Sequence, residues 1–219
     1  MIEVKNLRVV YHSNGRSFVG LEEFNGSFER GRISVIFGPS GSGKTSLLLS
    51  VATLLRPSEG SVAYDGMDVY SLPEAEMRKL RRKLGVSFQE PTFVNVLSVW
   101  ENVELALYGA GKLKAEFKRR AEELAKELGI GHTLHKRPTE ISGGEARRAS
   151  IVRALAHNPE VILLDEPTAY LDRESAELLL AHLEKEKERG KTIVVTTHDP
   201  IFEGIADAKF VLQYGRQLT

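Results

Sequence analysis

The most informative part of the sequence is Ile33-Ser34-Val35-Ile36-Phe37-Gly38-Pro39-Ser40-Gly41-Ser42-Gly43-Lys44-Thr45. Its first five residues are mostly apolar and β-branched, which is typical of a buried central strand. Helical spacing then predicts a helix over residues 44–55 that ends before Pro57. The sequence thus predicts a strand, a glycine-rich loop and a helix, in the order of the phosphate-binding pattern G-x-x-x-x-G-K-[ST].

The glycine-rich loop has the residue types that phosphate binding requires. Glycines allow the backbone to wrap a phosphate so that successive N–H groups point inward, and the following helix adds its positive end. Lys44 is expected to reach the β- and γ-phosphate oxygens, and the Thr45 hydroxyl to bind Mg²⁺. A flexible Gly/Ser turn is the alternative, but the flanking strand and helix favour a nucleotide site. The residues expected to bind ATP in this loop are Gly38, Pro39, Ser40, Gly41, Ser42, Gly43, Lys44, Thr45 and Ser46.

A second apolar stretch, residues 161–164, is followed directly by the carboxylates Asp165 and Glu166. The carboxyl end of a strand in a parallel sheet is where ligands bind. We expect Asp165 to hold Mg²⁺ in the Walker B role. Glu166 can then polarise a water molecule for attack on the γ-phosphate. The alternative is that both carboxylates only cap the turn before Pro167, but the phosphate-binding loop favours the metal site.

Strand and helix signals alternate along most of the chain. Short antiparallel strands are predicted in the first 30 residues, with turns at Asn14-Gly15 and Arg30-Gly31. Further strands are predicted at residues 61–64, 161–164 and 192–196, and a helix at residues 173–187 that is capped by Asp172 and ends near Gly190. Alternating strands and helices imply a mostly parallel sheet that is covered on both faces.

The middle of the chain is predicted to be helical. The Ser-x-x-Glu pairs Ser71/Glu74 and Ser98/Glu101 have capping-box spacing, and a third helix is predicted over residues 114–128, ended by Gly129. We therefore expect an α/β fold with a P-loop NTPase core, an N-terminal antiparallel β subdomain and an inserted helical subdomain. The predicted single domain, 1–219, divides into a nucleotide-binding core (1–88 and 157–219) and a helical subdomain (89–156).

Composition excludes several classes of protein. The chain has 219 residues, 30 basic and 30 acidic side chains, and no cysteine. The absence of cysteine excludes disulfide scaffolds, thiolate metal sites and a cysteine nucleophile. The balanced charge gives no general attraction to nucleic acid, so we expect no nucleic-acid partner. The N-terminus lacks a signal-peptide pattern and no apolar run approaches the ~18 residues of a spanning helix, which predicts a cytoplasmic protein.

Several motifs are more specific than the phosphate-binding loop, and together they cover essentially the whole chain. Ile141-Ser142-Gly143-Gly144-Glu145 precedes the second apolar strand and opens a helix. With it, the chain resembles the ATP-binding cassette (ABC) family, whose signature is Leu-Ser-Gly-Gly-Gln. The other matching elements are Gln89 (Q-loop), Ala169-Tyr170-Leu171-Asp172 (D-loop), His198 (switch histidine) and Tyr11 (A-loop aromatic).

This resemblance implies a role for each of these residues. Tyr11 is expected to stack on adenine, His198 to contact the γ-phosphate and Gln89 to bind Mg²⁺; Lys44, Glu166 and His198 are the expected catalytic residues. Tyr11 as a plain cross-strand aromatic, His198 as a hydrogen-bonded strand-end histidine and Gln89 as a surface residue are the alternatives. Two cassettes of the family pack head to tail, so each phosphate-binding loop faces the partner's signature. The signature and D-loop residues that bind ATP in this way are Ser142, Gly143, Gly144, Glu145 and Asp172.

Two positions depart from the family pattern. Glu145 replaces the usual glutamine and puts a carboxylate near the partner's γ-phosphate, unless it caps its own helix, which Ser142 and Glu145 can do by capping-box spacing. Ala169-Tyr170 replaces the common Ser-Ala and puts a bulky phenol near the dimer seam. Our hypothesis is that Glu145 mainly caps its helix.

The resemblance also implies partners. We expect an integral membrane permease as a separate chain, a homodimer or pseudo-dimer with a second ATPase subunit, and a location at the inner face of the cell membrane. Phe93, Val94 and Val96 are predicted to line a groove for a permease helix; filling of the helical core is the alternative. The pattern is most similar to the lipoprotein-release, macrolide-export and cell-division group, although amino-acid importers share much of it. The alternatives are a non-transport cassette, such as an iron–sulfur cluster assembly factor, and a nucleotide-binding module without hydrolysis.

Overall fold

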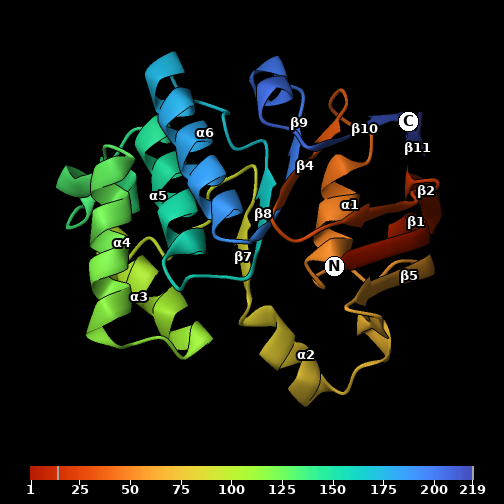
Figure 1. Cartoon of the computed structure of the whole chain (residues 1–219), viewed down its shortest axis with the longest axis horizontal. Helices are drawn as coiled ribbons and strands as arrows, with labels where there is room; N and C mark the ends of the chain where they lie inside the picture. The colour runs from red at the N-terminus through yellow and green to blue at the C-terminus, as the bar shows by residue number, and fades with distance from the viewer. Residues whose placement is uncertain (14, 219) are drawn as a thin grey trace.

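The computed structural model describes residues 1–13 and 15–218. Figure 1 shows two sheets with helix α1 (Lys44–Val51) between them, and a group of helices on the far side of the second sheet. The predicted turn at Asn14-Gly15 includes a residue outside the described part. The α/β fold class predicted from the sequence is confirmed by the arrangement of these layers.

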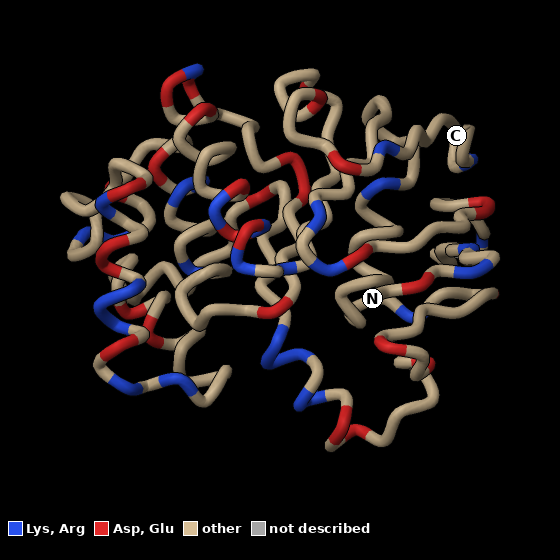
Figure 2. Tube along the Cα trace, viewed as in Figure 1, with Lys and Arg blue, Asp and Glu red and all other residues tan. Residues whose placement is uncertain are grey.

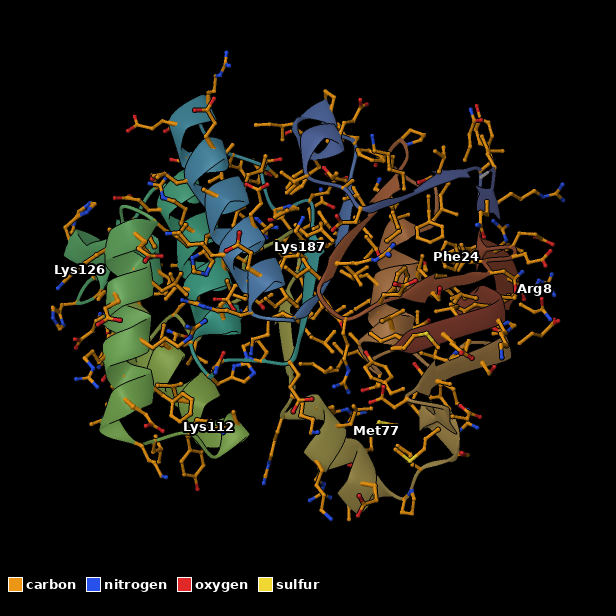
Figure 3. The ribbon with its side chains drawn as sticks, in the orientation of Figure 1. Arg8, Phe24, Met77, Lys112, Lys126 and Lys187 are labelled. Carbon is orange, nitrogen blue, oxygen red and sulfur yellow. The ribbon has the colours of Figure 1, made fainter. Side chains whose placement is uncertain are left out.

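The first sheet is antiparallel. Its strand order is β2-β1-β5-β6, and β3 also pairs with β1. Its strands are β1 (Ile2–Ser13), β2 (Arg16–Leu21), β3 (Gly26–Phe28), β5 (Glu59–Tyr64) and β6 (Met67–Asp68). Phe24, labelled in Figure 3, packs against Phe28 and Phe210, which joins this sheet to the second one through a buried aromatic cluster.

The second sheet is parallel except at one edge. Its order is β11-β10-β4-β9-β8-β7, and only the pair β10–β11 is antiparallel among the described residues. Its strands are β4 (Arg32–Phe37), β7 (Leu84–Ser87), β8 (Val161–Asp165), β9 (Thr192–Thr197), β10 (Ala208–Gln213) and β11 (Arg216–Gln217). In the register, Phe37 pairs with Thr197 and Asp165 with Thr196. The carboxyl ends of β4, β8 and β9 therefore meet at one edge of the sheet.

Helices cover the parallel sheet. The α-helices after α1 are α2 (Glu74–Arg81), α3 (Val99–Ala110), α4 (Ala115–Glu127), α5 (Gly143–Leu155) and α6 (Arg173–Glu188). Short 3₁₀ turns are η1 (Val69–Ser71), η2 (Gly131–Thr133), η3 (Pro138–Glu140) and η4 (Pro200–Gly204). Helices α3 to α6 gather on one side (Figure 1), and buried residues of these helices share one hydrophobic core with β4, β8 and β9. No strand lies between residues 89 and 156 in the described chain, as the sequence predicts.

Two local predictions are wrong. The helix after the glycine-rich loop ends at Val51, not at residue 55, because Thr53 adopts a left-handed conformation (φ 61°) and Leu54 N–H bonds to Leu49 O, as in a Schellman motif. The Ser71/Glu74 capping box does not form. Pro73 keeps Leu72 extended and α2 begins only at Glu74, while the Ser71 hydroxyl donates to Asp68 O instead.

Other helix boundaries agree with the sequence. Ser98 and Glu101 form the predicted capping box of α3, and Asp172 caps α6 by accepting a bond from Ser175 N–H. Gly129 follows α4 with φ 70°, as a left-handed stop requires.

Charged residues of both signs are interspersed along the whole trace (Figure 2), in keeping with the balanced composition. Over residues 1–13 and 15–218, none of the helices is both long enough and apolar enough to cross a bilayer.

Candidate functional site

The glycine-rich loop lies at the carboxyl edge of the parallel sheet, between β4 and α1. Gly41 and Gly43 have φ of 76° and 99°, which only glycine adopts without strain. A Cβ on Gly38 would lie 2.3 Å from Leu212 O, and one on Gly43 2.6 Å from Gly20 O. Among the described residues no side chain caps the N-terminus of α1, so its first N–H groups are available to an anion.

Lys44 is the first residue of α1 and is only 6% exposed. Its ammonium donates to Gly38 O at 2.7 Å and to Pro39 O at 3.1 Å, and it lies 3.2 Å from Glu166 Oε1. The loop and the end of β8 thus share one buried cation. This cation lies where the β- and γ-phosphates of a nucleotide in such a loop would be held.

Asp165 and Thr45 meet beside this lysine. The Thr45 hydroxyl donates to Asp165 Oδ2 at 2.7 Å, and the Thr196 hydroxyl donates to Asp165 Oδ1 at 2.6 Å. The Thr196 contact follows from the register, because β8 and β9 pair as neighbours up to Asp165 and Thr196, whereas Thr45 reaches Asp165 from the first turn of α1. The sheet therefore brings together the two oxygen donors that the sequence predicts for Mg²⁺.

Glu166 lies one residue beyond β8 and turns toward β9. It has a left-handed backbone (φ 46°), which is uncommon for a non-glycine residue and points its side chain away from the strand direction. Its Oε2 accepts from the Thr197 hydroxyl at 3.0 Å and lies 3.0 Å from His198 Nδ1. Burial alone raises the pKa of Glu166, but the His198 hydrogen bond and the Lys44 charge outweigh it and lower that pKa. Glu166 is therefore ionised and can accept a proton.

The structure gives Tyr11 features of both interpretations. Its hydroxyl lies 3.0 Å from the Ser46 hydroxyl on α1, which places the residue beside the phosphate-binding loop. Its ring also stacks on Phe18 across the strand pair β1–β2, with centroids 5.1 Å apart. Phe18 is 56% exposed and was not identified from the sequence; its place opposite Tyr11 in a hairpin is the signal that could have found it.

Gln89 lies exposed just after β7, where its side chain is accessible to a ligand. A second residue that sequence reasoning missed, Arg147 of α5, is 0% exposed and lies behind it. The Arg147 guanidinium donates to the carbonyls of Phe88 and Asp165, and to Pro167 O at 3.3 Å. Burial lowers the pKa of Arg147 to about 10. Arg147 thus ties α5 to the ends of β7 and β8.

Ser142, Gly143, Gly144 and Glu145 form the start of α5. The Glu145 carboxylate accepts from Ser142 N–H at 2.7 Å and from the Ser142 hydroxyl at 2.8 Å, which is a capping box, as hypothesised. These hydrogen bonds lower the pKa of Glu145 to about 2. A Cβ on Gly144 would lie 2.8 Å from Tyr170 O, so the signature and the D-loop are in close contact.

The predicted site residues therefore form two groups. The first group is joined by the hydrogen bonds and ion pairs given above and consists of Lys44, Thr45, Asp165, Glu166 and His198 with the glycine-rich loop. In the described chain, no hydrogen bond joins Ser142 or Glu145 to the loop residues 38–46. Asp172 belongs with this second group through α6, where Arg148 NH1 donates to Ser175 Oγ at 2.6 Å.

The first group fits ATP and Mg²⁺. Ser42 Oγ is buried and has no hydrogen-bond partner in the described part of the chain, which leaves a donor inside the loop for a phosphate oxygen. Hydroxyl and carboxylate oxygens are the ligands that Mg²⁺ prefers, and it commonly uses few protein ligands when phosphates and waters complete its shell. Thr45 and Asp165 supply such a pair of oxygens.

Comparisons with known proteins agree with this geometry. A family model described as "ABC transporter" matches residues 21–169. The chain is 38% identical over 218 residues to "Methionine import ATP-binding protein MetN 1" of Oceanobacillus iheyensis, covering 99% of this chain and 64% of that protein. It is 44% identical over 188 residues to "Macrolide export ATP-binding/permease protein MacB" of Campylobacter jejuni, covering 85% of this chain and 29% of that protein.

Solved structures give the same result. The "Dimeric Structure of MJ0796, a Bacterial ABC Transporter Cassette" is similar with a TM-score of 0.92 and 34% identity, covering 100% of this chain and 97% of that one. The same values hold for a post-hydrolysis dimeric state of MJ0796 that is bound to ADP and Pi. The relatives give no support to the iron–sulfur assembly alternative, and the predicted fold and family are confirmed. The chain belongs to the ABC transporter family of ATP-binding cassettes.

Proposed function

We propose that this chain is the ATP-hydrolysing subunit of an ABC transporter that powers a separate membrane permease. The observation that carries the proposal is the direct pairing of the loop with the end of β8, through Thr45 with Asp165 and Lys44 with Glu166. Thr45 and Asp165 supply the oxygens typical of a metal site, Lys44 is typical of phosphate binding, and Glu166 lies where the reacting water must be activated.

Each residue of the first group has a role in this proposal. Lys44 neutralises the β- and γ-phosphate oxygens, and Thr45 and Asp165, with Gln89, hold Mg²⁺, which supplies charge neutralisation on the phosphates. Glu166 accepts a proton from the water that attacks the γ-phosphorus, and ADP leaves with the electrons of the broken P–O bond. His198, hydrogen-bonded to Glu166, contacts the γ-phosphate. Tyr11 stacks on adenine.

The second group acts in trans in this proposal. Two copies, or this chain and a second ATPase subunit, pack head to tail so that Ser142 and the Gly143 and Gly144 amides of one copy meet the ATP held by the other. ATP binding then supplies the differential affinity that closes the dimer, and hydrolysis removes it. The similarity to a dimeric cassette supports this arrangement.

The rate of phosphate release from ATP tests the role of Glu166 in hydrolysis. Glu166→Gln keeps the shape of the side chain but removes its basicity. We expect turnover to fall about a hundredfold or more, the range of a lost general base, while the Kd for Mg·ATP changes by less than about threefold. Glu160→Gln, which breaks a surface pair with Lys83, is the matched control. A Glu166→Gln protein with wild-type turnover would refute the role of this carboxylate.

A cleft between α2 and α3 supports the proposed permease contact. Its volume is about 430 Å³, and small residues of α3 (Ala106, Gly109 and Ala110), Arg153 and arginines of α2 are among the residues that line it. Phe93, Val94 and Val96, which the sequence predicts for the groove, lie outside its lining. The Arg153 guanidinium also covers the Phe93 ring at 4.7 Å, and Val96 is 78% exposed. Phe93 itself is half-buried against the helical core, so the core-filling alternative holds for part of its surface. An amphipathic permease helix with acidic residues is complementary to this region.

Assembly with the permease tests this contact. We expect Gly109→Trp, which fills the cleft, and Val96→Asp to abolish co-purification with the permease while ATP binding by the isolated chain is unchanged. Leu178→Asp on α6, a similarly exposed apolar position, is the control. Intact assembly of both variants would remove this region from the proposal.

The proposed location is the inner face of the cell membrane, and the proposed direction is export or lipoprotein release. Similarity to MacB supports this direction, but the similarity to MetN 1 extends over more of the chain. Identification of the permease that co-purifies with this chain tests the direction. A permease of an importer would overturn it without affecting the hydrolytic role.

A further inference from the structure

The two carboxylate oxygens of Glu145 are held by different parts of the chain. Oε2 accepts both Ser142 bonds of the capping box. Oε1 lies 3.0 Å from Nε2 of His132, a residue of the 3₁₀ turn η2 that precedes the signature by ten residues. The capping box itself requires only one of the two oxygens, so the His132 contact is an additional constraint.

His132 is not a core residue. Its side chain is 62% exposed, whereas its neighbours Thr133 and Leu134 are buried. The turn is therefore anchored by those neighbours, and packing does not require an imidazole at position 132. What the imidazole does is to hold Oε1 and thereby the direction of the Glu145 side chain.

The direction of the Glu145 side chain determines whether its negative charge faces outward from the N-terminus of α5. The Ser142 hydroxyl hydrogen is donated to Oε2, and Glu145 N–H lies 3.3 Å from Ser142 Oγ. A carboxylate that turns outward would place a negative charge beside the anion that the proposed function brings to this helix N-terminus. Like charges at short distance repel, and the effect is strongest where a closed interface excludes water.

We propose that His132 is a positioning residue of the signature: it keeps the Glu145 carboxylate turned onto its own helix and away from the γ-phosphate that the partner cassette presents. This inference rests on the proposed function, since it requires the signature to meet ATP in trans. It assigns to His132 the compensation for the carboxylate that stands where the family usually has glutamine.

ATP-driven dimerisation tests the proposal. In a Glu166→Gln background with Mg·ATP, the dimer dissociation constant is measured by sedimentation for proteins with and without His132→Ala. We expect His132→Ala to weaken the dimer about threefold for each signature, the effect of one partly exposed contact to a carboxylate, and thus about tenfold for a homodimer with two signatures. His132→Gln, which keeps an amide donor, should restore most of the affinity.

Two controls separate positioning from a structural role. His135→Ala removes an exposed histidine three residues further on and should leave the dimer constant unchanged. Adding Glu145→Gln should abolish the effect of His132→Ala, because a neutral amide has no charge to hold away. Melting temperatures of the His132→Ala and His135→Ala variants should agree with that of their parent within about 2 °C, as expected for exposed positions.

The outcomes are distinct. Equal dimer constants with and without His132→Ala would overturn the inference, and so would the same loss in the presence of Glu145→Gln. Either result leaves the proposed function intact, since the parent Glu166→Gln protein still dimerises. A parent protein that stays monomeric with Mg·ATP would overturn the proposed function and this inference together.

Discussion

Replacement of Arg147 by methionine tests the link between α5 and the two strand ends. The guanidinium is fully buried and donates to four backbone carbonyls, those of Phe88, Gln89, Asp165 and Pro167, and to Ser87 Oγ; the bonds to Gln89 O and Ser87 Oγ are both 3.4 Å long. Hydrogen bonds to a charged group contribute about 1.5 kcal/mol each at the lower end, and the two 3.4 Å bonds about half of that, so the five together contribute about 6 kcal/mol. Burial lowers the pKa of Arg147 from 12.5 to about 10 even though nearby acidic groups raise it, which corresponds to a net cost of about 3 kcal/mol for keeping this charge inside the protein.

The expected net loss of unfolding free energy for Arg147→Met is thus about 3 kcal/mol. Methionine fills a similar volume, so no large cavity adds to the loss. Urea unfolding followed by circular dichroism is the assay, and the midpoint should fall by about 1 M. Arg148→Met is the matched control on the same helix, because Arg148 makes one side-chain hydrogen bond, to Ser175 Oγ, and should cost about 1 kcal/mol. Equal midpoints for the two variants would refute the reasoning.

Three further predictions concern the contact between α4 and α6, the binding of the adenine base and the signature. Burial raises the pKa of Glu186, but its hydrogen bond with Arg120 outweighs burial and lowers that pKa below 4.5. The ionised Glu186 carboxylate therefore stabilises the folded protein above pH 4.5, and this stabilisation is lost as the pH falls below that value. The melting temperatures of wild type and Glu186→Gln should accordingly differ at pH 7 and converge below about pH 4.5. A constant difference across that range would contradict this. Tyr11→Ala should raise the Kd for Mg·ATP about tenfold and Tyr11→Phe about twofold, measured by fluorescence titration; equal effects would assign the affinity to the hydroxyl. Gly144→Ala should lower ATP turnover without changing ATP binding by the monomer, because the new Cβ would lie 2.8 Å from Tyr170 O; unchanged turnover would show that this contact yields freely.

The loop-and-sheet part of the site was predictable because its signals are local. A β-branched run, a glycine-rich loop and a helix are contiguous in sequence, and Asp165 follows its strand directly. The parallel register places the ends of β4, β8 and β9 together, so that Thr45 at the start of α1 reaches Asp165, and Glu166 reaches His198. Only the general rule that strand ends meet at one edge was needed to expect this group.

The roles of Arg147 and His132 could not be predicted from the sequence, because they depend on long-range contacts. In the sequence, Arg147 is followed by Arg148, and a pair of arginines in a helix is typical of a solvated surface. The spacing of Arg147 from Ser150, Ile151 and Ala154 nevertheless places it on the buried face of the helix. His132 has no motif around it, and its contact with Glu145 depends on where η2 packs. Neither partner of these contacts is recognisable from residue type alone.

The two wrong helix boundaries have a similar origin. The left-handed Thr53 that ends α1 is held by Arg81 of α2, which donates to both its hydroxyl and its carbonyl. Helical periodicity extends past this point in the sequence, so the tertiary contact outweighs it. At Ser71, the capping-box spacing predicts a helix start. Pro73 keeps Leu72 out of the helical conformation, so no helix begins at Ser71.

In the proposed dimer, ATP held by the loop of one copy is sealed by the signature of the other. Light scattering of the Glu166→Gln protein during gel filtration, with and without Mg·ATP, measures whether this dimer forms. A doubling of the molar mass with Mg·ATP, abolished when Ser142→Arg is added, is the predicted result. A molar mass that stays at the value of one chain with saturating Mg·ATP would contradict the claim.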